Sequence, residues 1–134
     1  MSSDTAPAPL MPHPAVEALE VWLICRRGEQ QVRARQTLID LLQPWSERLR
    51  LQWMPDGQAL MQDMPHRPVS LAVVDARADR ACQGHLLPAL EQQHIDTLCM
   101  DELADMGTAA ARSWCWSELP RALQLWMRRH RLGA

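Results

Sequence analysis

The chain of 134 residues contains no lysine, phenylalanine or tyrosine. All fourteen basic residues are therefore arginine, and all six aromatic side chains are tryptophan. Any chemistry that requires a lysine amine or a phenol is excluded. Glycine is also scarce, and the five glycines lie singly rather than in a phosphate-binding loop. This absence argues against a nucleotide-binding enzyme.

Long apolar runs are missing as well. No stretch approaches the roughly 18 residues that a membrane-spanning helix requires. Residues 1–15 lack the basic and apolar regions of a secretory signal peptide. The net charge is −2, with acidic and basic residues interspersed, which gives no reason to expect binding to membranes or nucleic acid. We therefore expect a cytoplasmic protein.

Cysteine and histidine do not show the spacing of metal ligands. The four cysteines are scattered, and we expect reduced thiols rather than disulfides. Cys82 and His85 have a ligand-like spacing, but no second pair of this kind accompanies them, and a zinc site requires three or four ligands. The sequence thus predicts neither a metal site nor a cofactor.

Residues 1–17 contain four prolines among small residues. Such a composition buries little surface and resists regular structure. We expect a flexible tail, followed by one domain over residues 18–134, which is long enough to form a hydrophobic core.

Strand and helix patterns alternate along this domain. Short apolar runs predict strands at 20–25, 69–74 and 95–100, with a weak fifth strand at 108–114. The alternation of apolar and polar residues predicts a half-buried edge strand at 49–54. Apolar residues at helical spacing predict helices over 30–45, 58–64 and 85–93, and a last helix from an N-cap at Ser117 to 132. Only residues 101–107 separate the last two strands, so the fourth helix is shortened or lost. Right-handed crossovers between such units form a single five-stranded, doubly wound parallel sheet.

Two helices show an apolar face. The first predicted helix carries an apolar stripe of Val32, Leu38, Ile39, Leu42 and Trp45. The last one carries Leu119, Leu123, Trp126 and His130 on one face. We expect both faces to pack on the sheet.

Asp75 directly follows the run from Val69 to Val74, which is nearly continuous in apolar and β-branched residues. Such a run is typical of a central strand that is covered on both faces. The carboxyl ends of the strands are where open α/β sheets place ligand and catalytic groups. Asp75 is therefore the first candidate for a functional residue.

This layout resembles the receiver domain of two-component response regulators, a flavodoxin-like fold, over most of residues 19–132. In that family the third strand ends in the aspartate that accepts a phosphoryl group, and Asp75 matches it. The fifth strand ends in a lysine, a cis-proline and an aromatic residue. Here Arg112, Ser113 and Trp114 would stand in those places.

The departures from the family pattern favour a degenerate site. The resemblance implies two acidic residues after the first strand to hold Mg²⁺, and the chain has Cys25, Arg26 and Arg27 there, which are poor ligands for a hard cation. Met100 and Asp101 stand where the family carries a threonine or serine. We expect Asp75 to be neutralised by Arg26, Arg27 or Arg112.

Tryptophan and arginine near the C-terminus predict an interaction face. In receivers the fourth helix, fifth strand and fifth helix form the surface for dimers and partners. With the fourth helix cut to a turn, we expect less cover on the fifth strand, and Trp114 and Trp116 cannot both point inward easily. We expect Trp116 to be the exposed anchor, with Arg121 and Arg128 on the outward side of the last helix.

These observations lead to an interpretation as a pseudo-receiver that is not an enzyme. We expect it to act by protein-protein contact without phosphorylation, and a homodimer through the fifth strand and last helix is one form of that contact. A functional phosphoryl-accepting receiver that uses Asp75 is the alternative. A module that binds an anion or small ligand in an arginine-lined pocket is a second, weaker alternative. The basic segment 128–131 is better explained as a solvated helix end than as a nucleic-acid site.

Overall fold

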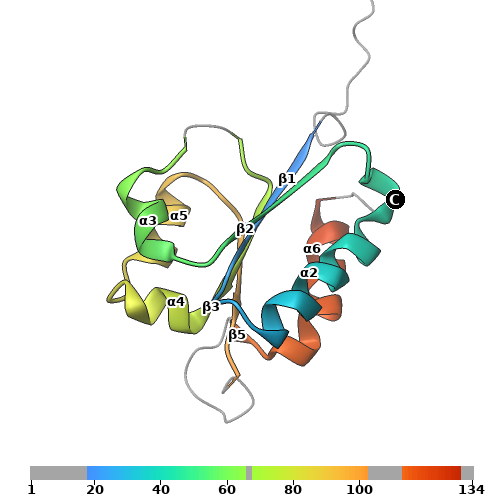
Figure 1. Ribbon diagram of the computed structural model, residues 1–134. Coiled ribbons are helices and arrows are strands. Elements are labelled where there is room, and N and C mark those ends of the chain that lie inside the picture. Colours follow the sequence, from blue (N-terminus) through green and yellow to red (C-terminus); the bar gives the residue numbers. More distant parts are fainter. Residues whose placement is uncertain (1–17, 66–67, 103–112, 131–134) are drawn as a thin grey trace, which may run out of the picture.

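A computed structural model describes residues 18–65, 68–102 and 113–130. They form an α/β fold around one sheet in which all paired strands are parallel (Figure 1). The strands are β1 (Leu19–Ile24), β2 (Leu49–Met54), β3 (Leu71–Asp75), β4 (Thr97–Met100) and β5 (Ser113–Trp114). Their order is β2-β1-β3-β4-β5, which is the order of flavodoxin-like doubly wound sheets. The predicted fold class is confirmed.

The position of each strand explains its sequence. β1 and β3 each lie between two other strands, and all of their residues are buried. They are almost continuously apolar because helices cover both faces of a parallel sheet. β2 is an edge strand, and its exposed Arg50 and Gln52 alternate with partly buried Leu49, Leu51 and Trp53. The predicted half-buried edge pattern of this strand is confirmed.

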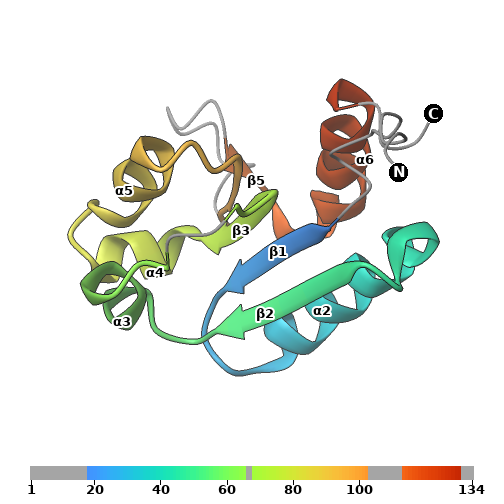
Figure 2. The same ribbon diagram turned by 90° about the horizontal axis from the view of Figure 1, so that it is seen from above.

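The helices form a layer on each face of the sheet (Figures 1 and 2). They are α2 (Glu29–Leu41), α3 (Gly57–Gln62), α4 (Ala76–Ala81), α5 (Leu86–Gln92) and α6 (Leu119–Arg129), with short 3₁₀ turns η3 (Gln43–Trp45) and η5 (Trp116–Glu118). Helices α2 and α6 pack together over the face that carries Leu19, Val21 and Leu23. Helices α3, α4 and α5 cover the opposite face, with Trp22 and Ile24.

Helix α4 was not expected from the sequence. It begins directly after Asp75, which is its N-cap, and the Asp75 side chain accepts a hydrogen bond from the backbone N–H of Arg77. The chain then turns at Gln83 and Gly84, both with positive φ (58° and 79°), before α5 begins at Leu86. The helical layer after β3 is therefore split into two short helices.

Three details of the predicted helix faces are wrong. Val32 is 62% exposed, because α2 turns Gln31, Ala34 and Leu38 toward the sheet instead. Ser117 does not cap the last helix, since it lies inside η5, whose N-cap is Cys115. The side chain of His130 is 41% exposed and lies beyond the packed face of α6.

Several predictions concern residues that the structure does not describe. They are the tail over residues 1–17, most of the connection 101–107, the strand segment 108–111 and Arg112. Within the described residues, no helix is long and apolar enough to cross a membrane.

Candidate functional site

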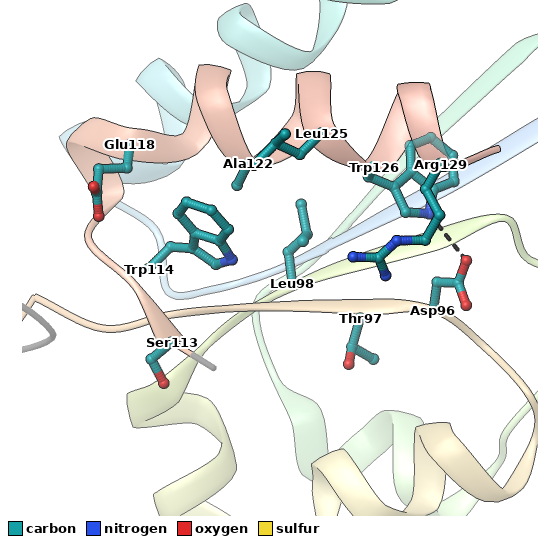
Figure 3. Close-up of a pocket in the computed structure, with 10 residues that line it drawn as sticks. All are labelled: Asp96, Thr97, Leu98, Ser113, Trp114, Glu118, Ala122, Leu125, Trp126 and Arg129. Carbon is teal, nitrogen blue, oxygen red and sulfur yellow. Dashed lines mark hydrogen bonds between the residues drawn. The ribbon is translucent and has the colours of Figure 1, made fainter. Parts of the chain in front are cut away.

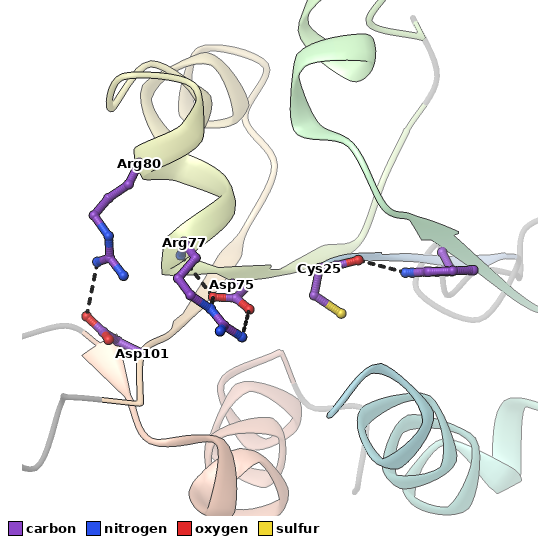
Figure 4. A network of polar contacts seen from close by, with 6 residues as sticks. Cys25, Asp75, Arg77, Arg80 and Asp101 are labelled. Carbon is purple, nitrogen blue, oxygen red and sulfur yellow. Dashed lines mark hydrogen bonds and ion pairs between the residues drawn. The ribbon is translucent and has the colours of Figure 1, made fainter. Parts of the chain in front are cut away.

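The carboxyl ends of β1, β3 and β4 bring three of the predicted site residues to one edge of the sheet. The chain passes from β1 outward to β2 and then returns to β3 on the other side of β1. Ligands of doubly wound sheets bind at such a switch point. Cys25 follows β1, Asp75 ends β3 and Asp101 follows β4. We call these three residues and their contacts the carboxyl edge (Figure 4).

Asp75 is buried, with 3% of its surface exposed, and its partner is Arg77. Arg77 donates from Nη2 to Asp75 Oδ2 at 3.0 Å and from Nε to Oδ1 at 3.4 Å. The backbone N–H of Arg77 donates to Oδ1 at 2.9 Å. These side-chain hydrogen bonds raise the pKa of the Arg77 guanidinium. Both carboxylate oxygens are therefore engaged from within α4.

The prediction that Arg26 or Arg27 neutralises Asp75 is wrong. Arg26 and Arg27 are both exposed, and the Arg27 guanidinium lies 5.8 Å from the ring centre of Trp53. That arrangement is a cation–π contact at the protein surface. Arg112 lies outside the described residues. Neutralisation of Asp75 thus comes from a neighbour in the sequence rather than from the loop after β1.

Cys25 is 1% exposed, and its thiol is held protonated. Burial, followed by the nearby Asp75 carboxylate, raises the pKa of Cys25 to about 12, although the charge of Arg77 lowers it. The backbone carbonyl of Cys25 accepts a hydrogen bond from Trp53 Nε1 at 2.8 Å. A neutral buried thiol is neither a ligand for a hard cation nor a ready nucleophile.

Asp101 is the second carboxylate of the carboxyl edge. Its Oδ2 lies 3.8 Å from Arg80 Nη1, and 14% of its side chain is exposed. Among the described residues, no three His, Cys, Asp or Glu side chains lie close enough together to hold a metal ion. The carboxyl edge therefore consists of two carboxylates, each facing an arginine of α4, and one neutral thiol.

A second candidate site lies at the lateral edge of the sheet that ends in β5, between α6 and strands β4 and β5 (Figure 3). It is an open hollow of about 730 Å³, which we call the edge groove. Leu98 lies between Trp114 and Trp126, and the Arg129 guanidinium extends into the same space. The lining residues are Asp96, Thr97, Leu98, Ser113, Trp114, Glu118, Ala122, Leu125, Trp126 and Arg129.

The carboxylates of the edge groove already have partners. Asp96 Oδ2 accepts a hydrogen bond from Trp126 Nε1 at 3.0 Å and lies 2.8 Å from His130 Nε2. Glu118 Oε1 accepts from the backbone N–H of Cys115 at 3.1 Å, which closes the capping box of η5. Both acidic side chains of the groove therefore hold its walls in place.

Two donors in the edge groove have no such partner. Within the described part of the chain, neither Trp114 Nε1 nor the Arg129 guanidinium makes a hydrogen bond or ion pair. Trp114 is partly buried, and 37% of Leu125 is exposed. The edge groove thus combines an apolar floor with unpaired N–H donors.

The predicted interaction face is partly wrong. Trp116 is only 6% exposed and belongs to the core between the sheet, α2 and α6, so it is not an exposed anchor. The turn η5 rotates Trp116 inward and leaves Trp114 over the edge groove. Trp126 is core, as expected. Arg121 and Arg128 are exposed as predicted, but Arg129 is the arginine that lines the groove.

Two functional candidates were missed in the sequence. Arg77 had a readable signal, because an aspartate at a strand end that caps a helix places the residue two positions later within reach. Arg129 had none, since its face of α6 depends on the packing of Leu119, Leu123 and Trp126.

The relation of this chain to known proteins rests on its topology. No protein-family model, curated protein or solved structure matches it. The strand order and the all-parallel sheet are those of a flavodoxin-like fold.

Proposed function

We propose that this protein is a pseudo-receiver that acts through protein-protein contact without phosphorylation. One observation carries the proposal: both oxygens of Asp75, the residue at the phosphoacceptor position, are bound by Arg77. A carboxylate held in this way is a structural ion pair rather than an available nucleophile.

The electrostatics of the carboxyl edge support this interpretation. Phosphoryl transfer to a carboxylate requires Mg²⁺ to neutralise charge on the phosphate and the nucleophile. Cys25 supplies a neutral thiol where an acidic ligand is required. Asp101 faces Arg80. Each carboxylate is thus opposite a fixed positive charge that competes with a metal ion.

The edge groove is the surface that we propose for contact with a partner. Its apolar floor and unpaired donors match the composition of protein interfaces, in which tryptophan and arginine are enriched. The partner is another protein, and a second copy of this chain bound through β5 and α6 is the first one to test.

We also propose that the protein is cytoplasmic. All four cysteines are free thiols, which is typical of the reducing cytoplasm.

The proposal is tested by adding Mg²⁺ and beryllofluoride, a phosphoryl analogue, to the ¹⁵N-labelled protein. We expect no change in the amide signals of residues around Asp75. The Asp75→Asn variant provides the baseline for non-specific effects of the two reagents.

The partner surface is tested by analytical ultracentrifugation, which measures self-association of the unmodified chain and of Trp114→Ala. We expect Trp114→Ala to associate less.

The alternatives give different results in the same titration. Saturable shifts around Asp75 that require Mg²⁺ indicate a functional phosphoryl-accepting receiver. Saturable shifts with the anion or with inorganic phosphate alone, which need no Mg²⁺, indicate a module that binds an anion at the arginines of the carboxyl edge. Either outcome overturns the proposal.

A further inference from the structure

Helix α6 carries three arginines beside the edge groove. Arg121, Leu125, Arg128 and Arg129 follow the spacing i, i+4, i+7 and i+8, which places them on one side of the helix. All four side chains are exposed, and α6 itself contains no acidic residue. Within the described part of the chain, none of the three arginines makes an ion pair or hydrogen bond. We call these three residues the arginine stripe, and each of them is free to pair with a ligand.

The charge of the edge groove is set by this stripe and by two carboxylates. Asp96 accepts a hydrogen bond from Trp126 Nε1 and lies 2.8 Å from His130 Nε2. Glu118 accepts from the backbone N–H of Cys115. Three guanidinium groups without partners thus outnumber two carboxylates that are already hydrogen bonded. Such a surface attracts a negatively charged ligand.

The two hydroxyl groups of the groove do not select the charge of a ligand. Thr97 and Ser113 extend to the opposite side of their strands from Leu98 (Figure 3). Ser113 Oγ lies 3.6 Å from Cys99 Sγ, and the Thr97 hydroxyl has no partner among the described residues. A hydroxyl can both donate and accept. Thr97 can therefore bind either the N–H or the carbonyl of a polypeptide backbone.

The apolar floor adds a second requirement. Leu98 and Trp114 are only partly buried, and 37% of Leu125 is exposed. A fitting ligand therefore carries apolar side chains as well as carboxylates. A nucleic acid fits less well, because it has a phosphate at every nucleotide, and Asp96 and Glu118 would repel some of them. A polypeptide can place its carboxylates opposite the arginines alone.

We propose that the edge groove and the arginine stripe bind an acidic segment of a partner protein, in which apolar residues stand among Asp and Glu. The apolar residues cover the floor of the groove, and Arg129 pairs with a carboxylate beside it. Arg121 and Arg128 attract further carboxylates at the rim. The inference deepens the proposed function, on which it rests for the role of the groove as a partner surface.

The test is a titration of the ¹⁵N-labelled full chain with a twelve-residue peptide that repeats Asp-Glu-Leu. The readouts are the indole N–H signal of Trp114, assigned with Trp114→Phe, and the side-chain Nε–H signal of Arg129, assigned with Arg129→Gln. We expect saturable shifts of both signals. The affinity should fall as salt is added, because exposed charges are screened. A peptide that repeats Asn-Gln-Leu has a similar shape without charge, and it should bind severalfold more weakly.

Variants of single arginines locate the binding site. Arg129→Gln should weaken binding of the acidic peptide by about tenfold, because its ion pair forms beside an apolar floor from which the peptide excludes water. Arg121→Gln and Arg128→Gln should each weaken binding by about twofold, since exposed ion pairs contribute little. Arg35→Gln changes an exposed arginine of α2 and is the matched control, which should bind as the unmodified chain does.

Several outcomes would overturn the proposal. They are no binding of the acidic peptide, equal binding of the neutral peptide, and equal binding by Arg129→Gln and Arg35→Gln. Tighter binding of a thymidine oligonucleotide of the same length would indicate a nucleic-acid site instead. If the chain associates with itself through the groove, the acidic peptide should reverse that association. Association that persists with the peptide in excess would show that a second copy occupies the groove.

These results are separable from those that test the proposed function. If beryllofluoride and Mg²⁺ shift the signals around Asp75 while the acidic peptide still binds in the groove, the proposed function fails and this inference stands. If the signals around Asp75 stay unchanged and the peptide does not bind, this inference fails and the absence of phosphorylation stands.

Discussion

The carboxyl edge and the edge groove differ in how their polar groups are satisfied. At the carboxyl edge, the buried carboxylate of Asp75 has Arg77 on both oxygens, and the Cys25 thiol is protonated and covered. In the edge groove, the donors of Trp114 and Arg129 have no partner among the described residues.

This difference shows which region is available for interactions. A polar group that is already paired gains little from a ligand, because binding must first break an existing contact. Unpaired donors beside an apolar floor gain from any ligand that supplies acceptors. Asp75, at a strand end where doubly wound folds place ligand and catalytic groups, is buried and paired. The unpaired donors lie beside β5, at the lateral edge of the sheet.

The largest expected effect is a difference in stability between variants of two tryptophans, Trp114 in β5 and Trp116 in η5. Trp116→Ala should destabilise the fold by about 3–5 kcal/mol, the usual range for removing a buried aromatic side chain. Trp114→Ala should cost about 1 kcal/mol or less, because Trp114 is only partly buried. Urea unfolding followed by circular dichroism measures both values. Equal losses would contradict the distinction between a core residue and a groove residue.

The next effect concerns pH and tests whether the carboxyl edge is covered. The pKa of Cys25 is raised from 9.0 to about 12 in the folded protein, so the unfolded chain loses this proton first as pH rises. The free energy of unfolding should therefore fall between pH 9 and pH 12, by about 1.4 kcal/mol per pH unit for this thiol. The chain has no lysine or tyrosine to obscure the effect.

The Cys25→Ala variant isolates the contribution of that thiol. Burial also raises the pKa values of Cys82 and Cys99, and both remain in the variant. The difference in the free energy of unfolding between the unmodified chain and Cys25→Ala should therefore stay constant below pH 9. Above pH 9 this difference should become smaller. An unchanged difference up to pH 11 would mean that Cys25 ionises normally and that the carboxyl edge is open.

A smaller effect is expected for the ion pair itself. Asp75→Ala removes the N-cap of α4 and leaves Arg77 without its partner, which should cost about 1–3 kcal/mol. The side chain of Arg77 is 42% exposed, so water compensates part of the loss. Asp75→Asn should cost less because the amide oxygen can still cap the helix. Exposed Asp63 provides the control, and a more stable Asp75→Ala protein would contradict the structural role.

Much of the fold could be predicted because its signals are local. Buried parallel strands are apolar along their whole length, and β1 and β3 were recognised by this property. The alternation in β2 revealed an edge strand. Helix α4 escaped recognition because its sequence, ARADRA, has no apolar periodicity. Its N-cap at Asp75 was the usable signal.

The candidate site was less predictable, because it depends on side-chain directions. The position of Asp75 at a strand end was readable, but Arg26 and Arg27 were expected to turn toward it and instead face solvent. The inward rotation of Trp116 depends on η5, a single 3₁₀ turn. The opening of the edge groove depends on the packing of α6 against β4, which joins residues far apart in the sequence.

The most direct test of the central claim is the intact mass of the protein after incubation with acetyl phosphate and Mg²⁺. A closed carboxyl edge predicts an unchanged mass, the same as that of Asp75→Asn treated in parallel. The addition of one phosphoryl group to the unmodified chain, absent in Asp75→Asn, would show that Asp75 leaves Arg77 to accept phosphate and would contradict the account.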